Sequence, residues 1–333
     1  VMPATRVLVT GSSGFIGQHV VKVLVGQGYE VMGIDLQFPH GETDHFTFQQ
    51  CDLLDKPKLE RVVSQFAPQA IVHLAARTDL DETQDLQGYA ANMAGVENLV
   101  AAIRATASVK RCIFTSSQLV CEIGYAPKHD QDYKPSTLYG ESKVLGETIV
   151  RQSDGGGVVW CLARPTTIWG PGMNAHYQNY LRLISTGQYF HVGPKPLYKS
   201  YGFVGNVAYQ YRRLLEAPES AIHRKMFYVA DYQPISLREW SNAFQRELGA
   251  RPILTVPVRL ARIMARVGDG LNACGWRKFP FNSFRLKNIL TEYQFDLAPT
   301  RAVCGEVPCP LDQGVTETVA WFINRDSAAR PQP

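Results

Sequence analysis

A glycine-rich stretch near the amino end constrains the fold of this chain more than any other feature. Residues 10–17 read TGSSGFIG, directly after an apolar run at 6–10 that is typical of a buried strand. Gly11 allows a tight turn, Gly14 allows a pyrophosphate to approach the start of the next helix, and Gly17 allows that helix to pack closely on the strand. The order of strand, glycine-rich loop and helix therefore predicts a dinucleotide-binding unit.

The residue at the end of the second predicted strand indicates which dinucleotide is bound. Asp35 lies 18 residues after Gly17, close to the position at which a ribose-binding acid is expected. Its carboxylate can accept hydrogen bonds from both ribose hydroxyls of NAD, whereas it would repel the 2′-phosphate of NADP. No arginine follows in the segment IDLQF. The sequence therefore favours NAD as the cofactor.

Short apolar runs and helical patterns alternate through the first half of the chain. The apolar runs lack the polar alternation of a half-exposed sheet, as expected for parallel strands that are covered on both faces. Strands are predicted at 6–10, 30–34, 70–74, 111–115 and 158–162, and helices at 17–27, 56–66, 86–105 and 137–151. This alternation predicts an α/β fold, a Rossmann-type doubly wound parallel sheet with right-handed crossovers.

The regular alternation ends after Pro165, and the rest of the chain is richer in tyrosine, proline and glycine. We expect residues 1–170 to form an NAD-binding Rossmann domain. Residues 171–333 are expected to form mainly a smaller substrate-binding lobe over the carboxyl ends of the strands, where such folds bind ligands. A segment near 200–232 is expected to return to the first domain, because 225–230 has the composition of a further strand. Helices are also predicted at 236–248 and 258–271.

Composition and charge narrow the classes of partner. The chain has 333 residues, 45% of them hydrophobic, and a net charge of +4, which gives no reason to expect nucleic-acid binding. No apolar run of the sequence approaches the length of roughly 18 residues that a membrane-spanning helix needs. A strand is predicted from Arg6 onward, which leaves no room for a signal peptide. Seven cysteines without metal-binding spacing favour reduced thiols and the cytoplasm. We expect no metal, nucleic-acid or membrane partner.

A tyrosine and a lysine lie one helical turn apart in the segment YGESK at residues 139–143. Tyr139 and Lys143 could share an exposed helix face by chance, or the lysine could make the phenol a proton carrier near neutral pH. A free phenol has a pKa of about 10, so a shift to about 7 requires around 4 kcal/mol. The ammonium of Lys143, together with a positively charged nicotinamide ring, is the kind of charge that supplies such a shift. Beside a predicted dinucleotide site, the catalytic interpretation is favoured.

With TGSSGFIG and YGESK in one chain, the sequence resembles the extended short-chain dehydrogenase/reductase superfamily, and within it the NAD-dependent epimerase/dehydratase family. The similarity extends through CDL at 51–53, HLAA at 73–76, FTSSQLV at 114–120 and LARPTTIWGPG at 162–172. It implies that Tyr139 is the acid/base, that Lys143 is its helper, and that the hydroxyl of Ser117 orients the substrate. Ser116 is the alternative to Ser117 if the alignment is off by one residue.

The resemblance also implies which residues bind the cofactor and the substrate. The cofactor-binding residues are Gly11, Ser13, Gly14, Phe15, Ile16, Gly17, Asp35, Asp52, Leu53, Leu74, Ala75, Ala76, Asn92, Tyr139, Lys143 and Pro165. Substrate binding is implied for Ser117, for Lys199, which stands where sugar epimerases carry a pyrophosphate-binding arginine, and for Arg285. A homodimer is expected, because relatives often pair through helices such as the one predicted at 86–105.

The two residues that directly follow the catalytic hydroxyl distinguish between the possible activities. Dehydratases of this branch carry an aspartate–glutamate pair where this chain has Gln118 and Leu119, and the reductase-epimerases that make fucose nucleotides have a cysteine in place of Leu119. Neither side chain can deliver the proton that elimination of water needs. We therefore expect an NAD-dependent enzyme that oxidises and re-reduces one carbon of a small-molecule substrate, a nucleotide-activated sugar, most simply a 4-epimerase.

Two other functions stay open. An NAD(P)-dependent dehydrogenase or reductase of the 3β-hydroxysteroid or keto-acid type also has counterparts of the segments IWGPG and SFRLKNILTEYQFDLAP. A regulator that binds NAD without turnover belongs to a different class of protein, but regulators of this kind usually lack the tyrosine–lysine pair.

Two further features have more than one interpretation. His73 ends a buried strand, where a packed core histidine is the simpler expectation than a catalyst. Arg259, Arg262 and Arg266 share one face of the helix predicted at 258–271. This face is either a solvated basic surface or a contact for phosphate or for a second copy of the chain.

Overall fold

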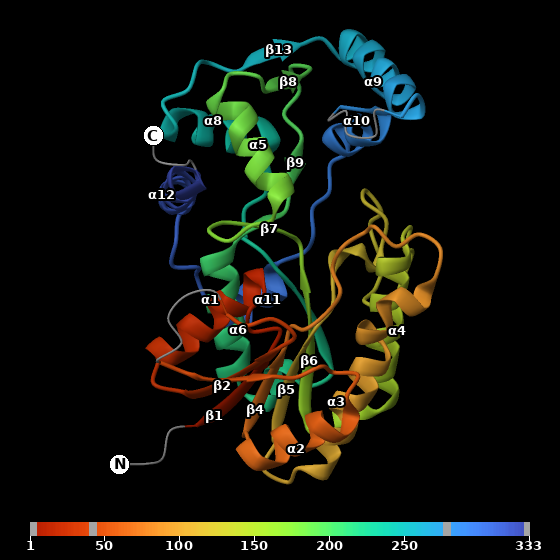
Figure 1. Ribbon diagram of the computed structural model, residues 1–333, viewed down its shortest axis with the longest axis vertical. Helices are drawn as coiled ribbons and strands as arrows, with labels where there is room; N and C mark the ends of the chain where they lie inside the picture. The colour runs from red at the N-terminus through yellow and green to blue at the C-terminus, as the bar shows by residue number, and fades with distance from the viewer. Residues whose placement is uncertain (1–4, 40–44, 276–280, 330–333) are drawn as a thin grey trace. The chain divides into compact units, whose positions relative to one another are not determined.

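The computed structural model describes residues 5–39, 45–275 and 281–329, and the chain divides into two compact units. Unit 1 comprises Val1–Ile168, Gly202–Tyr232 and Asp296–Cys309. Unit 2 comprises Trp169–Tyr201, Gln233–Phe295 and Pro310–Pro333. Each unit is therefore assembled from segments that are far apart in the sequence, as the colours of the chain show (Figure 1).

A seven-stranded parallel sheet forms the centre of unit 1, in the order β11-β6-β5-β4-β1-β2-β3. The strands are β1 (Arg6–Thr10), β2 (Glu30–Asp35), β3 (Thr47–Gln50), β4 (Ala70–His73), β5 (Arg111–Thr115), β6 (Val159–Pro165) and β11 (Lys225–Val229). β1 lies between β2 and β4, so the strand order reverses at β1, where doubly wound sheets bind their ligands. The fold class predicted from the sequence is confirmed.

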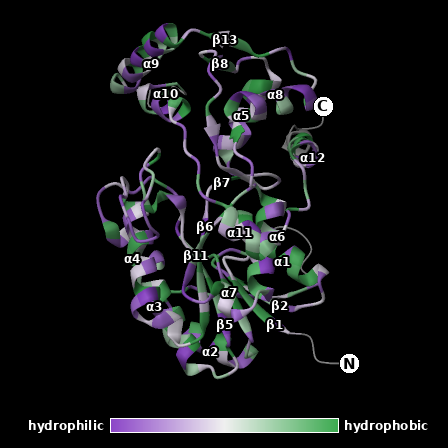
Figure 2. Cartoon of the chain, turned by 180° about the vertical axis from the view of Figure 1, so that it is seen from behind, coloured by the Kyte–Doolittle hydropathy of each residue, from purple (hydrophilic) through white to green (hydrophobic). Residues whose placement is uncertain are grey.

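Helices cover both faces of this sheet. They are α1 (Phe15–Gly26), α2 (Lys56–Phe66), α3 (Ala94–Ala105), α4 (Leu138–Gln152), α6 (Val204–Glu216), α7 (Glu219–Ile222) and α11 (Ala298–Cys304), with 3₁₀ turns η1 (Leu86–Asn92), η2 (Gln118–Val120) and η3 (Asp154–Gly156). α6 packs against α1 and α11, whereas α3 packs against α2 and α4. The two groups lie on opposite sides of the sheet (Figures 1 and 2).

The main core lies between the sheet and the layer of α2, α3 and α4. Leu8 and Ile71 of the sheet meet Leu59 and Leu99 of the helices there, and Trp160 closes the cluster from β6. All five side chains are almost fully buried. Burial of each leucine contributes about 1.5–3 kcal/mol relative to exposure. Coverage on both faces explains why these strands are apolar without alternation, which Figure 2 shows as green along the central strands.

The structure differs from the predicted elements in three places. The helix predicted at 86–105 is divided into η1 and α3, because Met93 leaves helical geometry at φ −122° and ψ −78°. β6 continues to Pro165, three residues beyond its predicted end. β3 and α6 were not predicted. β3 has a mixed polar and apolar sequence, TFQQ, that gives no strand signal, and α6 follows a glycine-rich segment.

Unit 2 is smaller and mostly helical. Its helices are α5 (Ala175–Ser185), α8 (Leu237–Glu247), α9 (Val258–Ala273), α10 (Ser283–Leu290) and α12 (Leu311–Ala329). Short strands pair as β8 (Phe190–Val192) with β13 (Leu254–Val256) and as β9 (Tyr198–Lys199) with β12 (Ile235–Ser236); β7 (Thr167–Trp169) pairs with β10 (Tyr201–Phe203). Trp240 stacks on Tyr180 with ring centroids 5.0 Å apart and anchors α8 against α5. Within the described ranges, no helix has the length and hydrophobicity that a bilayer crossing requires.

Candidate active site

The structure brings Ser117 and Tyr139 together although they belong to different elements. Ser117 is the N-cap of η2, and its Oγ accepts a hydrogen bond of 3.1 Å from the backbone N–H of Leu119. Tyr139 lies in the first turn of α4 and is 7% exposed. The side chain of Ser117 lowers the pKa of the Tyr139 phenol. Because Oγ accepts from Leu119, its proton is available to a second oxygen.

Local sequence around α4 makes this approach possible. Thr137 is the N-cap of α4, and its Oγ1 accepts from the backbone N–H of Gly140 at 3.0 Å. A Cβ on Gly140 would lie inside contact distance of the carbonyl oxygen of Leu119, so only glycine lets the start of α4 reach η2. The motif YGESK therefore contains a packing requirement at its second residue in addition to its two chemical groups.

Lys143 lies one turn further along α4, and its Nζ donates to the carbonyl oxygen of Thr115 at 2.8 Å. Burial lowers the pKa of Lys143 to about 8, and the Glu147 carboxylate opposes that shift. Burial raises the pKa of the Tyr139 phenol, and this effect outweighs the lowering by the Ser117 side chain. The sequence argument required a lowered phenol pKa, whereas in the chain by itself the pKa is raised. The carbonyl of Thr115 holds the lysine.

Glu147, one turn beyond Lys143, belongs to a buried ion pair that the sequence analysis missed. Its two carboxylate oxygens accept from Nε and Nη2 of Arg164 on β6, each at 2.7 Å, and both side chains are 1% exposed. The phenol of Tyr133 donates to the same carboxylate at 2.7 Å. Arg164 also lies over the rings of Tyr133 and Tyr228. The pair fixes the middle of α4 to the sheet.

A sequence signal for this pair was available. Arg164 is a charged residue inside an otherwise apolar strand, VWCLARP, and a buried arginine requires a partner. Glu147 is the acidic residue on the Lys143 side of α4. Neither spacing identifies the other residue, because they are brought together only by the packing of α4 on β6.

The hydroxyl of Ser116, the alternative to Ser117, has a different environment. Its Oγ is buried and has no hydrogen-bond partner among the described residues. It lines a small internal cavity together with His73, Asn92, Lys143 and Glu147. The side chain of Ser117 lowers the pKa of Tyr139, whereas Ser116 lines the cavity, so Ser117 stays the proposed residue that orients a substrate oxygen.

The glycine-rich loop has the shape that a dinucleotide phosphate needs. Gly11 has φ +71°, and a Cβ there would lie 2.6 Å from the backbone nitrogen of Ala75. A Cβ on Gly17 would overlap the carbonyl oxygen of Gly11. α1 begins at Phe15 with Gly14 as its N-cap and without a side-chain cap, so its first N–H groups, which include that of Ile16, are available to an anion.

Asp35 and the residues after β3 lie along the same edge of the sheet. The Asp35 carboxylate accepts from the backbone N–H of Ser13 at 3.0 Å and from that of Gln37 at 3.1 Å, so two amides hold it at the end of β2. Asp52 accepts from the backbone N–H of Leu54 at 2.9 Å, and the neighbouring Leu53 is buried. A fixed acid at this position fits the ribose of NAD.

Backbone around residues 74–76 is fixed by a hydroxyl of β1. Thr10 Oγ1 accepts from the N–H groups of Leu74 and Ala75 at 3.2 and 3.1 Å. It also forms a hydrogen bond of 2.7 Å with Nδ1 of His73. Burial lowers the pKa of His73 to about 3, so the imidazole is neutral. This geometry agrees with the packed core histidine expected from the sequence, and it positions the stretch that ends with Ala76.

Asn92 and Pro165 complete the predicted cofactor residues. The Asn92 side chain accepts from the backbone N–H of Arg77 at 2.9 Å, and it donates to the carbonyl oxygen of Arg77 and to the hydroxyl of Ser142. Asn92 therefore braces the segment after β4 against α4. Pro165 is buried at the carboxyl end of β6, paired in register with Val229 of β11.

The two predicted substrate residues of unit 2 differ in exposure. Lys199 is buried, and its Nζ donates to the carbonyl oxygen of Asn288 at 2.7 Å and lies 5.3 Å from the ring centre of Tyr293. Burial lowers the pKa of Lys199 to about 8. Arg285 is exposed on α10, with Nη1 3.5 Å from Nδ1 of His176. Of these two cations, Arg285 is therefore the one that a ligand of unit 2 can reach directly.

The comparison with protein families settles the class of the molecule. The sequence model of the NAD dependent epimerase/dehydratase family matches residues 7–230. The chain belongs to the NAD-dependent epimerase/dehydratase family. It is an NAD-dependent enzyme of the extended short-chain dehydrogenase/reductase type, as the sequence predicted, and its glycine cradle and fixed Asp35 fit that cofactor.

Relatives of this epimerase/dehydratase include enzymes of different specificity. An N-acetyl-alpha-D-glucosaminyl-diphospho-ditrans,octacis-undecaprenol 4-epimerase from Escherichia coli O157:H7 is 25% identical over 328 residues, with 95% of each chain covered. A 3-beta-hydroxysteroid dehydrogenase from Mycolicibacterium neoaurum is 27% identical over 340 residues, with 95% of this chain and 91% of the relative covered. The crystal structure of a UDP-glucose 4-epimerase from Brucella ovis in complex with NAD has a TM-score of 0.75 at 21% identity, with 96% and 98% covered, and this likeness supports the fold.

Asp35 provides a test of the cofactor site. Asp35→Ala is expected to weaken NAD binding by about 10- to 100-fold, because a hydrogen bond to a charged group contributes about 1.5–3 kcal/mol. Affinity for NADP should fall less, since its 2′-phosphate loses a repulsive neighbour. Isothermal titration calorimetry with both dinucleotides measures this. Asp296→Ala is the matched control, because Asp296 also accepts from the N–H two residues on. Equal NAD affinity in Asp35→Ala and in the unsubstituted enzyme would contradict the assignment.

Proposed function

We propose that this enzyme is a 4-epimerase of a sugar carried on a diphosphate, most simply a nucleotide-activated sugar. The observation that carries the proposal is the pair of buried hydroxyls of Ser117 and Tyr139, with two residues that lack an acid directly after Ser117. Epimerisation needs one oxidation and one reduction at the same carbon, and both steps move a proton at the same oxygen. A single acid/base group beside an orienting hydroxyl supports this chemistry.

Each residue of the pair has a separate task in this proposal. Tyr139 takes the proton from the C4 hydroxyl when that carbon is oxidised, and it returns the proton when the carbonyl is reduced. Ser117 donates a hydrogen bond to the same oxygen and supports the negative charge that develops on it. Bound NAD supplies the acceptor and donor of hydride. Lys143 adds positive charge one turn away, held by the carbonyl of Thr115.

The environment of η2 supports epimerisation over dehydration. Gln118 is buried, and its Nε2 donates to Oγ1 of Thr167 at 3.3 Å, so an amide stands at this position. Leu119 is apolar, and its carbonyl oxygen packs against Gly140 of α4. Loss of water from a sugar requires an acid at the leaving hydroxyl and a base at the neighbouring carbon. Neither Gln118 nor Leu119 supplies one.

A one-way dehydrogenase of the hydroxysteroid type is the second candidate. The relative from Mycolicibacterium neoaurum carries that name and spans nearly the whole chain. The environment of Lys199 also favours this candidate, because the ammonium that was expected to bind a diphosphate is buried against the carbonyl of Asn288. The 4-epimerase named for Escherichia coli O157:H7 supports the first candidate over an equal length of the chain. The fate of one hydrogen separates the two candidates.

The deciding experiment uses UDP-sugars deuterated at C4. An epimerase that removes and returns the same hydrogen yields a product epimer that still carries deuterium at C4, with no net change in the absorbance of the reduced nicotinamide. Mass spectrometry and proton NMR of the product measure this. Reduced cofactor accumulating in step with loss of a sugar or hydroxysteroid would identify the dehydrogenase instead. Solvent deuterium at C5 with loss of water would show a dehydratase.

We propose that unit 1 binds NAD, that unit 2 contributes mainly to substrate binding, and that two copies pair as a homodimer. The first part is supported by the positions of the glycine cradle, Asp35 and Tyr139, which all belong to unit 1. The second is supported by exposed cations of unit 2, such as Arg285. For the dimer, α3 and α4 pack side by side, and Leu145 of α4 is an exposed leucine.

A further inference from the structure

α9 in unit 2 has three distinct faces. Ala261, Ala265 and Gly268 are its buried residues, and the two alanines cluster with Leu286 of α10. The other two faces lie outside this contact. With 100° per residue, Arg259, Arg262 and Arg266 fall on one stripe, and Leu260, Ile263 and Val267 fall on the stripe next to it.

The apolar stripe is exposed in this fold. Leu260 is 48% exposed, Ile263 59% and Val267 56%. Scattered single apolar residues are ordinary on protein surfaces, but three on one helix face form a contiguous patch. Phe284, 68% exposed at the start of α10, adds a large aromatic side chain in the same unit. A purely solvated basic face, the simpler expectation from the sequence, does not account for these side chains.

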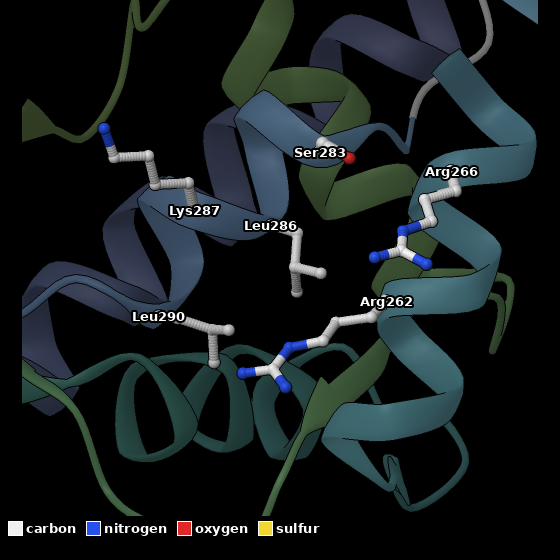
Figure 3. A pocket seen from close by; sticks show the side chains of 6 residues that line it. All are labelled: Arg262, Arg266, Ser283, Leu286, Lys287 and Leu290. Atoms are coloured by element: carbon white, nitrogen blue, oxygen red, sulfur yellow. The ribbon is translucent and has the colours of Figure 1, made fainter. Parts of the chain in front are cut away.

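The basic stripe continues into a groove between α9 and α10. The groove is lined by Arg262, Arg266, Ser283, Leu286, Lys287 and Leu290. Figure 3 shows the side chains of Arg262 and Arg266 extending from α9 toward α10. The acidic residue of α9, Asp269, accepts from the backbone N–H and the hydroxyl of Ser283 and so caps α10. The groove thus presents guanidinium and ammonium groups above an apolar floor.

The arrangement of arginines beside an apolar stripe indicates which kind of surface would bind α9. A helix with arginines beside an apolar stripe suits the interface of a bilayer, where aliphatic side chains enter the acyl boundary and cations meet lipid phosphates. Nucleic acid would leave the apolar stripe in water, and a free phosphate would use only the groove. Figure 2 shows green and purple interleaved along α9. Charge complementarity therefore selects an anionic phospholipid surface.

We propose that α9 forms a membrane-docking face, with the apolar stripe at the acyl boundary and the arginines on the phosphates of anionic lipids. The docking face comprises Arg259, Leu260, Arg262, Ile263, Arg266 and Val267. Docking is reversible surface binding, distinct from a membrane span. The sequence excluded a membrane partner because it has no span; the face becomes visible only when the exposure of α9 is known. The proposal is independent of the substrate of the enzyme.

Vesicle co-sedimentation of the whole chain tests the docking face. Vesicles of phosphatidylcholine with phosphatidylglycerol should bind the enzyme, vesicles of phosphatidylcholine alone should bind it far more weakly, and added sodium chloride should release it. The triple variant Arg259→Gln, Arg262→Gln and Arg266→Gln should lower the partition coefficient on the order of 100-fold, because each basic side chain contributes about fivefold. Ile263→Ser with Val267→Ser should lower it about tenfold.

A charge-matched control is available in unit 1. Lys22→Gln, Lys56→Gln and Arg61→Gln remove three exposed positive charges from α1 and α2 and should leave vesicle binding unchanged. Thermal unfolding confirms that each variant is folded, as expected for surface positions. Equal loss of binding in both triple variants would overturn the proposal, because general charge would then explain it. Two other results would also overturn the proposal. One is binding of soluble glycerol phosphate that is as strong as the binding of vesicles. The other is an Ile263→Ser, Val267→Ser enzyme that keeps vesicle binding and loses only its dimer.

Discussion

Tyr139→Phe is expected to lower turnover by about 10² to 10⁴ while the fold and NAD binding are retained, because a positioned acid/base contributes that much to the rate. The substitution removes one oxygen. The ring stays in place, since it is 7% exposed and lies edge-on to Tyr89 with centroids 6.0 Å apart. Loss of the phenol hydroxyl and of the hydrogen bond that it can make should change the free energy of unfolding by only about 0.5–1.5 kcal/mol.

The measurement is the steady-state rate with the substrate identified by the deuterium experiment, together with NAD titration and thermal unfolding. Tyr209→Phe is the matched control. The Tyr209 phenol donates to the carbonyl oxygen of Cys304 at 3.2 Å, so this variant also loses one phenol hydrogen bond, far along the chain from Ser117 and Lys143. A folded Tyr139→Phe enzyme with the turnover of the Tyr209→Phe enzyme would remove Tyr139 from the acid/base role.

Arg164→Met is expected to destabilise the enzyme by about 3–5 kcal/mol, because it leaves the Glu147 carboxylate buried without its partner. Two oxygens that each accept at 2.7 Å would lose those bonds, while the phenol of Tyr133 would still donate to Oε2 and Nη2 of Arg151 would lie 3.9 Å from it. The double variant Glu147→Leu with Arg164→Met should recover at least half of the loss, since an apolar pair requires no compensating charge. Urea unfolding of the two variants measures both effects.

An exposed ion pair of the same unit provides the control for Arg164→Met. Arg224 and Asp154 form two hydrogen bonds, but the two side chains are 62% and 44% exposed. Arg224→Met should cost much less free energy of unfolding than Arg164→Met, because water solvates the remaining carboxylate. If both arginine substitutions cost the same free energy, burial would not explain the contribution of the Glu147–Arg164 pair.

The features that could be predicted from the sequence alone depend on residues close together in the chain. The apolar strands of the sheet, the loop with Gly11, Gly14 and Gly17, and the acid at the end of β2 depend on residues close together in the chain. The spacing of Tyr139 and Lys143 within one helix is also local. These features were enough to predict the doubly wound sheet, the NAD cofactor and the family, and each of those three predictions is confirmed.

Helix boundaries and the partners of charged groups required the fold. The helix predicted at 86–105 is interrupted directly after Asn92, whose side chain bonds the backbone of Arg77 fifteen residues earlier in the chain. The carbonyl oxygen that holds Lys143 of α4 belongs to Thr115 of β5. No periodicity in the sequence encodes either contact, because each depends on how two separate elements pack.

The sequence by itself therefore determined the architecture, the cofactor and the chemical groups of the proposed site. Only the tertiary structure decided that Lys199 is buried and that the apolar stripe of α9 faces solvent. The reason is that residue type and spacing fix which groups a helix or strand carries on each face. Which of those faces is buried, and which partner a buried charge meets, depends on segments that are distant in the chain and come together only in the folded molecule.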